Sequence, residues 1–594
     1  MSNKSLHNFH IPVMGIAFTI DTPIRVAQFG ISSVISIIDD EIIEKMRKFY
    51  SHKFNFDFLA ITVKADDHRA GRITAYLDLV DDIVNQKFKA FKEELINKKQ
   101  SLINFIDILP NTSKIRFELQ KLLQSHGDGN SMLKNYLNDH LSPGSIDVNI
   151  MTKVDKDNYK NKEQLPIIYN DAHASLRGFA QSKLSSSLVL SAGMNPRLYS
   201  YIEQFEDFYP DVNHQLKKKI ILKVSDFRSA MIQGQFLAKK GLWVSEYRIE
   251  SGLNCGGHAF ATDGLLLGPI LEEFKQRRNE LAESAHHLLI PALQQKSKPF
   301  PSGPFELKIT VQGGVGTSEE HEFLLSHYHM DSVGWGSPFL LVPEATSVDS
   351  ETRELLENSG EDDFYLSNLS PLGTLFNTVK GTSNEINRRA KQANDRFGSS
   401  CPKKFLALNK EFSPEGLCMA STKYQTLKFE QLEKEKRTLP LNQFKKKEKE
   451  ITEKACLCVG LANSSYIENK IEIKGEDQGV VICPGPNLAY FDKSVSLSQM
   501  IKHIYGTADV LAAIYRPNMF INELKMYVDY LKNGLSESLI EMNASSEKKW
   551  DNFRQNLLNG ISYYEDLFTN PSFPQGDILR NLQDLQKCKL LLRL

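Results

Sequence analysis

The sequence predicts an α/β fold, a TIM (β/α)8 barrel, and three observations lead to that prediction. Short β-branched runs recur along the chain, helical patterns separate most of them, and the last two runs end in glycines. Eight strand–helix units in one domain indicate a closed barrel rather than an open, doubly wound sheet. The runs expected as strands are residues 11–17, 31–37, 146–151, 187–191, 219–224, 242–247, 307–312 and 331–335.

The domain organisation follows from length and from a change in composition. A chain of 594 residues is too long for one ordinary domain, so we expect two or three. Residues 1–384 are expected to form the barrel, interrupted by a charged helical insertion at about residues 41–140. Residues 385–594 are expected to form an α-rich region, because Lys, Glu and most of the cysteines are concentrated there.

The overall composition is that of a soluble globular protein, with 41% hydrophobic and 24% charged residues and a net charge of −1. This balance gives no support for nucleic acid or a membrane surface as a partner. The polar N-terminus and the lack of an apolar run of roughly 20 residues lead us to expect a cytoplasmic protein. Seven cysteines, an odd number, suggest reduced thiols or metal ligands rather than disulfides.

Two successive expected strands end in glycine-rich turns, and together they predict a phosphate site. Glycine lets a backbone N–H approach an anion without a Cβ in the way. The loops after strands 7 and 8 form the standard phosphate site of these barrels, although either turn alone would be an ordinary glycine turn. The residues expected to bind there are Gly313, Gly314, Gly334, Gly336 and Ser337.

These two segments also carry a family resemblance. Gln312-Gly-Gly-Val-Gly-Thr317 and Val333-Gly-Trp-Gly-Ser-Pro-Phe339 resemble the FMN phosphate signature of nitronate monooxygenases and FMN-dependent enoyl-ACP reductases. Pro12-Val-Met-Gly15 is similar to the family's first strand, Asp147-Val-Asn-Ile-Met151 to its strand-and-Asn segment, and Glu250-Ser-Gly-Leu-Asn-Cys-Gly-Gly-His258 to its Gly-Gly-His loop. The resemblance covers roughly residues 10–380 outside the insertion.

Within that family, the chain most resembles the trans-acting enoyl reductase of polyunsaturated fatty acid synthases. In both, the Gly-Gly-His loop leads into a long helix, and a segment like Leu369-Ser-Pro-Leu-Gly-Thr-Leu-Phe376 follows the barrel. The resemblance implies FMN as the cofactor, with Met14, Gly15 and Gly257 against it. The chain departs from the family pattern at Trp335, at Pro338 and in the size of the insertion. These departures bear on the identity of the substrate more than on flavin binding.

Four residues are candidates for the chemistry. The resemblance places His258 facing the flavin, where it would act as acid, base or substrate-orienting group; the alternative is a structural histidine. Cys255 is a second acid or, more simply, a small buried side chain. Lys223 ends an expected strand and would stabilise negative charge on reduced flavin, unless it only reaches solvent. Asn149 would hydrogen-bond the flavin or its ribityl chain, or form a turn.

The cysteines after residue 400 suggest a second site. A C-x-C pair with prolines nearby suits an iron–sulfur cluster or, alternatively, structural zinc. The spacing matches no ferredoxin or zinc-finger pattern, so unrelated buried thiols remain an alternative. The candidate ligands are Cys401, Cys418, Cys456, Cys458 and Cys483, with Cys588 left out.

The function expected from these features is an FMN-dependent oxidoreductase that reduces an enoyl thioester or a related small electrophile, with NAD(P)H as a candidate electron donor. The alternatives are nitronate oxidation with O2, a non-catalytic barrel that serves as a scaffold subunit, and flavin-dependent modification of nucleic acid. The charged run 428–454 would contact an RNA or an acyl carrier protein, or simply form a solvated helix.

Overall fold

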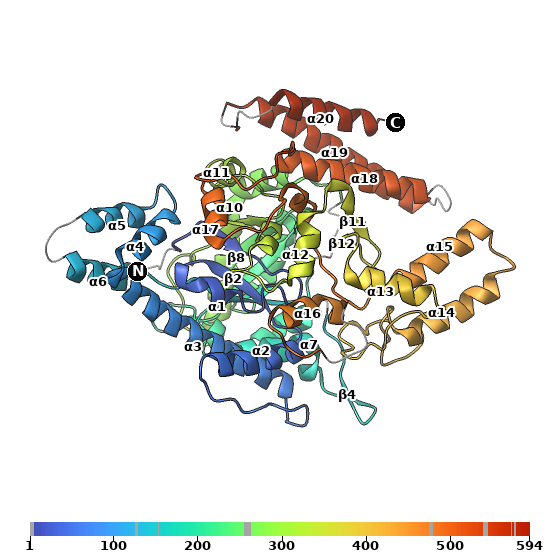
Figure 1. The fold of residues 1–594 in the computed structure, drawn as a ribbon, viewed down its shortest axis with the longest axis horizontal. Helices are drawn as coiled ribbons and strands as arrows, with labels where there is room; N and C mark the ends of the chain where they lie inside the picture. The colour runs from blue at the N-terminus through green and yellow to red at the C-terminus, as the bar shows by residue number, and fades with distance from the viewer. Residues whose placement is uncertain are drawn as a thin grey trace.

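Eight parallel strands close into a barrel at the centre of the structure, a computed structural model (Figure 1). It describes residues 5–124, 129–152, 154–254, 263–473, 479–538, 544–571, 573–574 and 578–593. Around the barrel the strand order is β1-β10-β9-β8-β7-β6-β3-β2, which confirms the predicted TIM (β/α)8 fold. The strands are β1 (Phe9–Ile11), β2 (Ser32–Ser36), β3 (Ile146–Ile150), β6 (Ser187–Leu190), β7 (Lys219–Val224), β8 (Val244–Glu250), β9 (Lys308–Gln312) and β10 (Ser332–Gly334).

Two of the predicted strands differ from the observed ones by more than one residue at an end. The first ends at Ile11 rather than at residue 17, because Pro12 has no N–H to donate and Gly15 has a φ of +54°. The sixth begins at Val244 rather than at residue 242, because the N–H of Leu242 still donates to the carbonyl of Leu237 at the end of the preceding helix. This strand then continues to Glu250, which brings its carboxylate to the site.

Helices surround the barrel, as an alternating β/α pattern requires. The long helix expected after the Gly-Gly-His loop begins at Leu267 and continues to Gln295, past Pro291. Helices of this outer layer include α1 (Thr22–Val26), α7 (Asp171–Gln181), α8 (Pro196–Ile202), α9 (Phe227–Ala238), α10 (Leu267–Gln295) and α11 (Ser318–Ser326), and a short hairpin, β4 (Tyr159–Lys160) with β5 (Glu163–Gln164), precedes α7.

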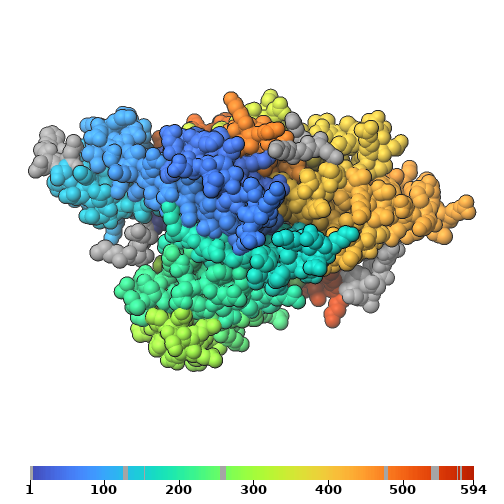
Figure 2. Space-filling view, turned by 90° about the horizontal axis from the view of Figure 1, so that it is seen from below, coloured from blue at the N-terminus to red at the C-terminus, as the bar shows by residue number. Residues whose placement is uncertain are grey.

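The segment predicted as an insertion is helical, but part of it belongs to the barrel's outer layer. The hydroxyl of Tyr76 on α3 donates to the carbonyl of Ile20 (2.8 Å), and Arg72 pairs with Asp40 (2.8 Å). The helices that follow α3 project to one side (Figures 1 and 2). The five helices are α2 (Asp40–Lys53), α3 (His68–Asn97), α4 (Lys99–Asp107), α5 (Lys114–Gln124) and α6 (Gly129–His140).

The C-terminal region lies across the carboxyl ends of the barrel strands. Lys403 pairs with Asp39, which caps α2 just after β2 (2.6 Å), and Glu523 accepts from the hydroxyl of Ser251, just after β8 (2.7 Å). The elements that follow the last barrel strand and α11 are α12 (Ser350–Glu357), β11 (Phe364–Ser367), β12 (Phe376–Val379), α13 (Ser383–Gln392), α14 (Thr422–Glu435), α15 (Leu441–Thr452), α16 (Leu457–Glu468), α17 (Leu497–Ile504), α18 (Met519–Ser538), α19 (Ala544–Thr569) and α20 (Ile578–Leu591), and we refer to them together as the C-terminal region. The domain boundary at residue 384 stays a prediction.

The charged run 428–454 forms most of α14 and α15, which project opposite α4–α6 (Figures 1 and 2). Its lysines pair with nearby carboxylates, as in Lys428–Glu411 (3.0 Å) and Lys447–Glu435 (2.8 Å). These contacts fit a solvated pair of helices. None of the helices in the described ranges has both the length and the hydrophobicity needed to cross a bilayer.

Candidate active site at the carboxyl ends of the strands

The two glycine-rich turns lie side by side, because β9 and β10 are neighbours in the barrel. Gly313 and Gly314 both have a positive φ, +109° and +84°. A Cβ on Gly314 would lie 2.7 Å from Cδ1 of Leu253, so this position has no room for a side chain. The backbone after β9 therefore adopts a conformation that glycine alone makes accessible at low cost.

Several backbone N–H groups in these two turns are unpaired. Those of Gly313, Gly314, Gly336 and Ser337 donate to no acceptor among the residues that the structure describes. Buried or partly buried N–H groups of this kind are normally paired, and neighbouring free ones form an anion-binding site. The arrangement fits the phosphate of a bound cofactor.

The N–H of Gly316, which lies between these donors in the chain, is paired within the protein. It donates to Oε2 of Glu320 (2.9 Å), and the guanidinium of Arg516 pairs with both oxygens of the same carboxylate (2.7 and 2.9 Å). Arg516 also donates to the carbonyl of Gly314 (2.7 Å). Sequence reasoning missed Arg516 and Glu320, because no local pattern links positions so far apart in the chain.

Ser337 contacts another segment that the sequence did not point to. Its Oγ accepts from the N–H of Gly485 (2.8 Å), which leaves the hydroxyl proton available for an anion. A Cβ on Gly485 would lie 2.5 Å from the carbonyl oxygen of Leu253, so only glycine lets this segment lie so close. Asn487 fixes the same segment by donating to the carbonyl of Val315 (2.8 Å).

Gly334 has a different environment from the other predicted phosphate ligands. It is the last residue of β10, where a Cβ would meet Cβ of Gln312 at 2.6 Å and Nε2 of His10 at 3.0 Å. Its lack of a side chain therefore makes room inside the barrel. A role for Gly334 at the phosphate stays a prediction.

A polar cluster occupies the ends of the neighbouring strands. The ammonium of Lys223 pairs with Oε1 of Glu250 (2.9 Å), and the amide of Gln312 donates to the same oxygen (2.8 Å). Within the described chain, Oδ1 of Asn149 and Oε1 of Gln312 are buried without a hydrogen-bond partner. Unpaired buried acceptors are costly, so these two fit a ligand that donates to them. Glu250 is a further residue that sequence reasoning missed, although its motif contained it.

An apolar pocket lies at the ends of β1, β2 and β3. Gly15 lines the pocket together with Met151, and Met14, the residue before Gly15, is fully buried. The C-terminal region supplies the opposite wall. The lining residues are Gly15, Ile16, Ile38, Met151, Val154, Phe376, Phe405, Leu406, Leu457, Cys458 and Leu461. We refer to this set as the apolar pocket.

The predicted acid and its neighbours cannot be placed. Cys255, Gly257 and His258 lie outside the described residues. Their roles at the cofactor therefore stay predictions from the sequence. In the chain, this segment comes after β8, which ends at Glu250.

The five candidate metal ligands do not form a ligand set. In the described parts of the chain, no three His, Cys, Asp or Glu side chains are arranged to hold a metal ion, so an iron–sulfur cluster or zinc finds no support. Instead, the thiols of Cys401 and Cys418 form a hydrogen bond, which lowers the pKa of Cys401 to about 7. Burial raises the pKa values of Cys456 and Cys458, so both are neutral thiols. Cys483 is buried near the Gly485 segment.

No protein-family model matches the chain, and no curated protein matches it by sequence. Among solved structures, it is similar to the enoyl reductase domain of MlnA from the macrolactin biosynthesis cluster of Bacillus amyloliquefaciens, with 15% identity, a TM-score of 0.35, and coverage of 71% of this chain and 89% of that chain. It is also similar to FabK from Thermotoga maritima, with 11% identity, a TM-score of 0.30, and coverage of 69% of this chain and 85% of that chain. A third similar structure is the nitroalkane oxidase of Streptomyces ansochromogenes, with 9% identity, a TM-score of 0.29, and coverage of 64% of this chain and 85% of that chain. These likenesses are distant, and the barrel assignment rests on the strand order itself.

Proposed function

We propose that this chain is an FMN-dependent oxidoreductase that reduces an enoyl thioester or a related small electrophile. The observation that carries the proposal is the group of unpaired N–H donors at Gly313, Gly314, Gly336 and Ser337. They lie in the turns whose sequence resembles an FMN phosphate signature, at the end of the barrel where such enzymes bind their ligands.

The residues present fit a flavin. The main-chain donors would hold its phosphate, and the free acceptors on Asn149 and Gln312 would receive N–H or O–H groups of the ring or ribityl chain. Lys223 and Glu250 would fix the charge beside the ring. When bound, FMN would supply hydride chemistry that no side chain here provides.

The apolar pocket supports a substrate with an alkyl or acyl part. Its walls come from the barrel and the C-terminal region, and most of the side chains that line it are apolar. His258 is our candidate for donating a proton to the substrate. Nitronate oxidation remains the same-class alternative from the sequence, and NAD(P)H remains the proposed electron donor.

The first test is the absorption spectrum of protein purified without air, with flavin and metal analysis of the same sample. Flavin bands are the expected result, and NAD(P)H-dependent reduction of crotonyl thioesters should follow. A His258→Ala variant should lose turnover while keeping its flavin. Protein that takes up no flavin even when FMN is added would disprove the proposal, and flavin without any turnover would favour the scaffold alternative.

A further inference from the structure

Glu523 of α18 binds both flanks of the segment that connects β8 to α10. Its Oε1 accepts from the hydroxyl of Ser251 (2.7 Å) and from the N–H of Gly252 (3.3 Å), just after β8. Its Oε2 accepts from the N–H of Leu267 (2.7 Å), the first residue of α10. One carboxylate therefore joins the two ends of the segment in whose sequence the predicted acid, His258, stands.

The contact of Glu523 with α10 replaces a local helix cap. Leu266, at the N-cap position, has no side chain that could accept a hydrogen bond, so the first N–H groups of the helix need other acceptors. Glu523 accepts from the N–H of Leu267, and the hydroxyl of Tyr564 on α19 accepts from that of Gly268 (3.0 Å). The positive end of the helix dipole also favours a carboxylate there. Two residues of the C-terminal region therefore stabilise the start of α10.

Helices α18 and α19 pack against α10, and α19 also contacts the end of the same segment (Figure 1). The side-chain amide of Asn556 on α19 donates to the carbonyl of Asp263 (2.8 Å). A Cβ on Gly264 would lie 2.5 Å from the carbonyl oxygen of Phe553, so the two backbones approach closely here. The C-terminal region thus restricts the segment beyond the single contact of Glu523.

The carboxylate of Glu523 is buried without a charged partner in the described chain. Its side chain is 2% exposed, and its hydrogen-bond partners there are one hydroxyl and two N–H groups. Burial raises the pKa of Glu523, and the three donors act in the opposite direction. Burying a charge costs free energy unless hydrogen bonds compensate for it. Because all three donors belong to the flanks of one segment, the placement of that segment is the role that this carboxylate fits.

We propose that Glu523 is a positioning residue, which acts through the segment 253–266 to place His258 at the flavin. This inference rests on the proposed function, and it extends the active site to the C-terminal helices α18 and α19. Proton transfer depends on accurate placement of the donor, and a displacement of about 1 Å can lower the rate about a hundredfold. The structure thereby assigns the C-terminal region a part in catalysis.

The experiment is a double-mutant cycle on the full-length protein loaded with FMN. Glu523→Gln keeps the size of the side chain and removes one acceptor, and His258→Ala removes the proposed acid. NAD(P)H-dependent reduction of a crotonyl thioester gives kcat and KM for the parent, the two single variants and the double variant. Flavin content is measured in each sample.

We expect Glu523→Gln to lower kcat about tenfold, with KM and flavin content close to those of the parent. In the His258→Ala background the same change should alter kcat less than about twofold, because the group that it positions is absent. A purely structural role would lower kcat by the same factor in both backgrounds, and that result would overturn the proposal. An unchanged kcat in Glu523→Gln would overturn it as well.

Tyr564→Phe provides a second variant with a smaller risk to folding. It keeps the buried ring and removes only the hydroxyl that accepts from the N–H of Gly268. We expect kcat to fall about threefold, again only while His258 is present. If Glu523→Gln does not fold, this variant decides the same question, and equal losses in both backgrounds would reject the proposal.

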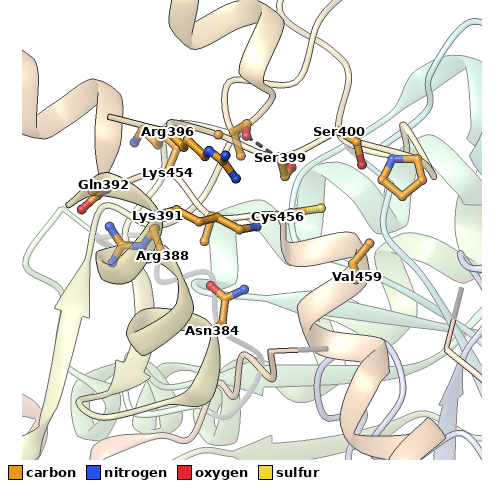
Figure 3. A pocket seen from close by; sticks show the side chains of 14 residues that line it. Asn384, Arg388, Lys391, Gln392, Arg396, Ser399, Ser400, Lys454, Cys456 and Val459 are labelled. Atoms are coloured by element: carbon orange, nitrogen blue, oxygen red, sulfur yellow. Dashed lines mark hydrogen bonds between the residues drawn. The ribbon is translucent and has the colours of Figure 1, made fainter. Parts of the chain in front are cut away.

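The controls lie elsewhere in the C-terminal region. Figure 3 shows a pocket between α13, the loop at residues 396–402 and the start of α16, and none of the described residues that line it is among those that bind the two flanks. Arg396→Gln alters an exposed side chain of this pocket, and Glu547→Gln is a matched change at an exposed position of α19. Both should keep the kcat of the parent. A loss in either control as large as that in Glu523→Gln would overturn the proposal.

Hydrogen–deuterium exchange separates this inference from the proposed function, because it requires neither flavin nor substrate. Glu523→Gln should speed exchange about tenfold in peptides that contain Gly252 and Leu267, and not in peptides from β7 and α9. Faster exchange in a protein that takes up no flavin would reject the oxidoreductase function, and the positioning role with it, although the contact would stand. Flavin and turnover with unchanged exchange and kcat in Glu523→Gln would reject the role of Glu523 alone.

Discussion

Arg516 and Glu320 form a bidentate ion pair, with Nη1 to Oε1 at 2.7 Å and Nη2 to Oε2 at 2.9 Å, although 196 residues separate them in the chain. Both side chains are buried. Because Glu320 also accepts from the N–H of Gly316, the pair attaches the C-terminal region to the glycine-rich turn after β9. The C-terminal region is therefore part of the candidate cofactor site.

Replacing Arg516 by Gln should destabilise the protein by about 3 kcal/mol, because it leaves the Glu320 carboxylate buried without its cation. Denaturant unfolding measures the loss. Arg554→Gln, which breaks an exposed pair with Asp551, is the control and should cost under about 1 kcal/mol. Equal losses in the two variants would show that the buried pair is not important for stability.

Replacing Gly314 by Val should reduce the bound flavin strongly. The φ of +84° strains any other residue, and a Cβ would lie 2.7 Å from Leu253, so the turn must move. Flavin released on denaturation measures the occupancy. Gly303→Val, at a position with no atom within 4 Å of a new Cβ, should keep normal occupancy. Full flavin retention in Gly314→Val would refute the phosphate site.

Lys223 and Glu250 should tune the flavin potential in opposite directions. Lys223→Met removes the cation that we propose lies beside the flavin ring, and it should lower the potential by roughly 30 mV, about 1.4 kcal/mol for a two-electron couple. Glu250→Gln removes the anion paired with it and should raise the potential. Lys219→Met, at the exposed opposite end of β7, should leave it unchanged. Shifts of the same sign in both site variants would contradict the assigned positions.

The thiol of Cys401 should ionise near neutral pH only while Cys418 is present. The hydrogen bond from Cys418 lowers the pKa of Cys401 to about 7, from an ordinary value of 9.0. Cys418→Ala should therefore raise it, as read from the pH dependence of Cys401 alkylation by mass spectrometry. Cys483→Ala should not change it.

Acid should destabilise the protein through His321. Burial lowers its pKa to about 3, and its Nδ1 accepts from the indole N–H of Trp335 (3.2 Å), which requires the neutral ring. The unfolded chain takes up this proton below about pH 6.5, so the free energy of unfolding should fall by up to about 1.4 kcal/mol per pH unit from there towards pH 3. His321→Gln should reduce that slope, whereas His52→Gln, at an exposed histidine, should not. An unchanged slope in His321→Gln would contradict the buried neutral ring.

The sequence alone predicted the barrel, because β-branched runs, helical periodicity and glycine turns are local signals that each element carries itself. The runs at residues 219–224 and 307–312 became β7 and β9 with nearly the predicted bounds. The turn at Gly313 and Gly314 could also be predicted from the sequence, because a left-handed backbone conformation favours glycine whatever lies around it.

Only the tertiary structure decided which distant side chains share the site. It brought Arg516 to Glu320, Gly485 to Ser337 and the thiol of Cys401 to that of Cys418. It formed no group of three or more metal-ligating side chains among the described residues, where clustering along the chain had suggested one ligand set. Sequence proximity is a poor guide to such contacts, because ion pairs and hydrogen bonds between remote residues form only after helices and strands have packed. Local backbone preferences therefore determined the barrel and its glycine turns, while long-range packing determined the charges and hydrogen bonds around them.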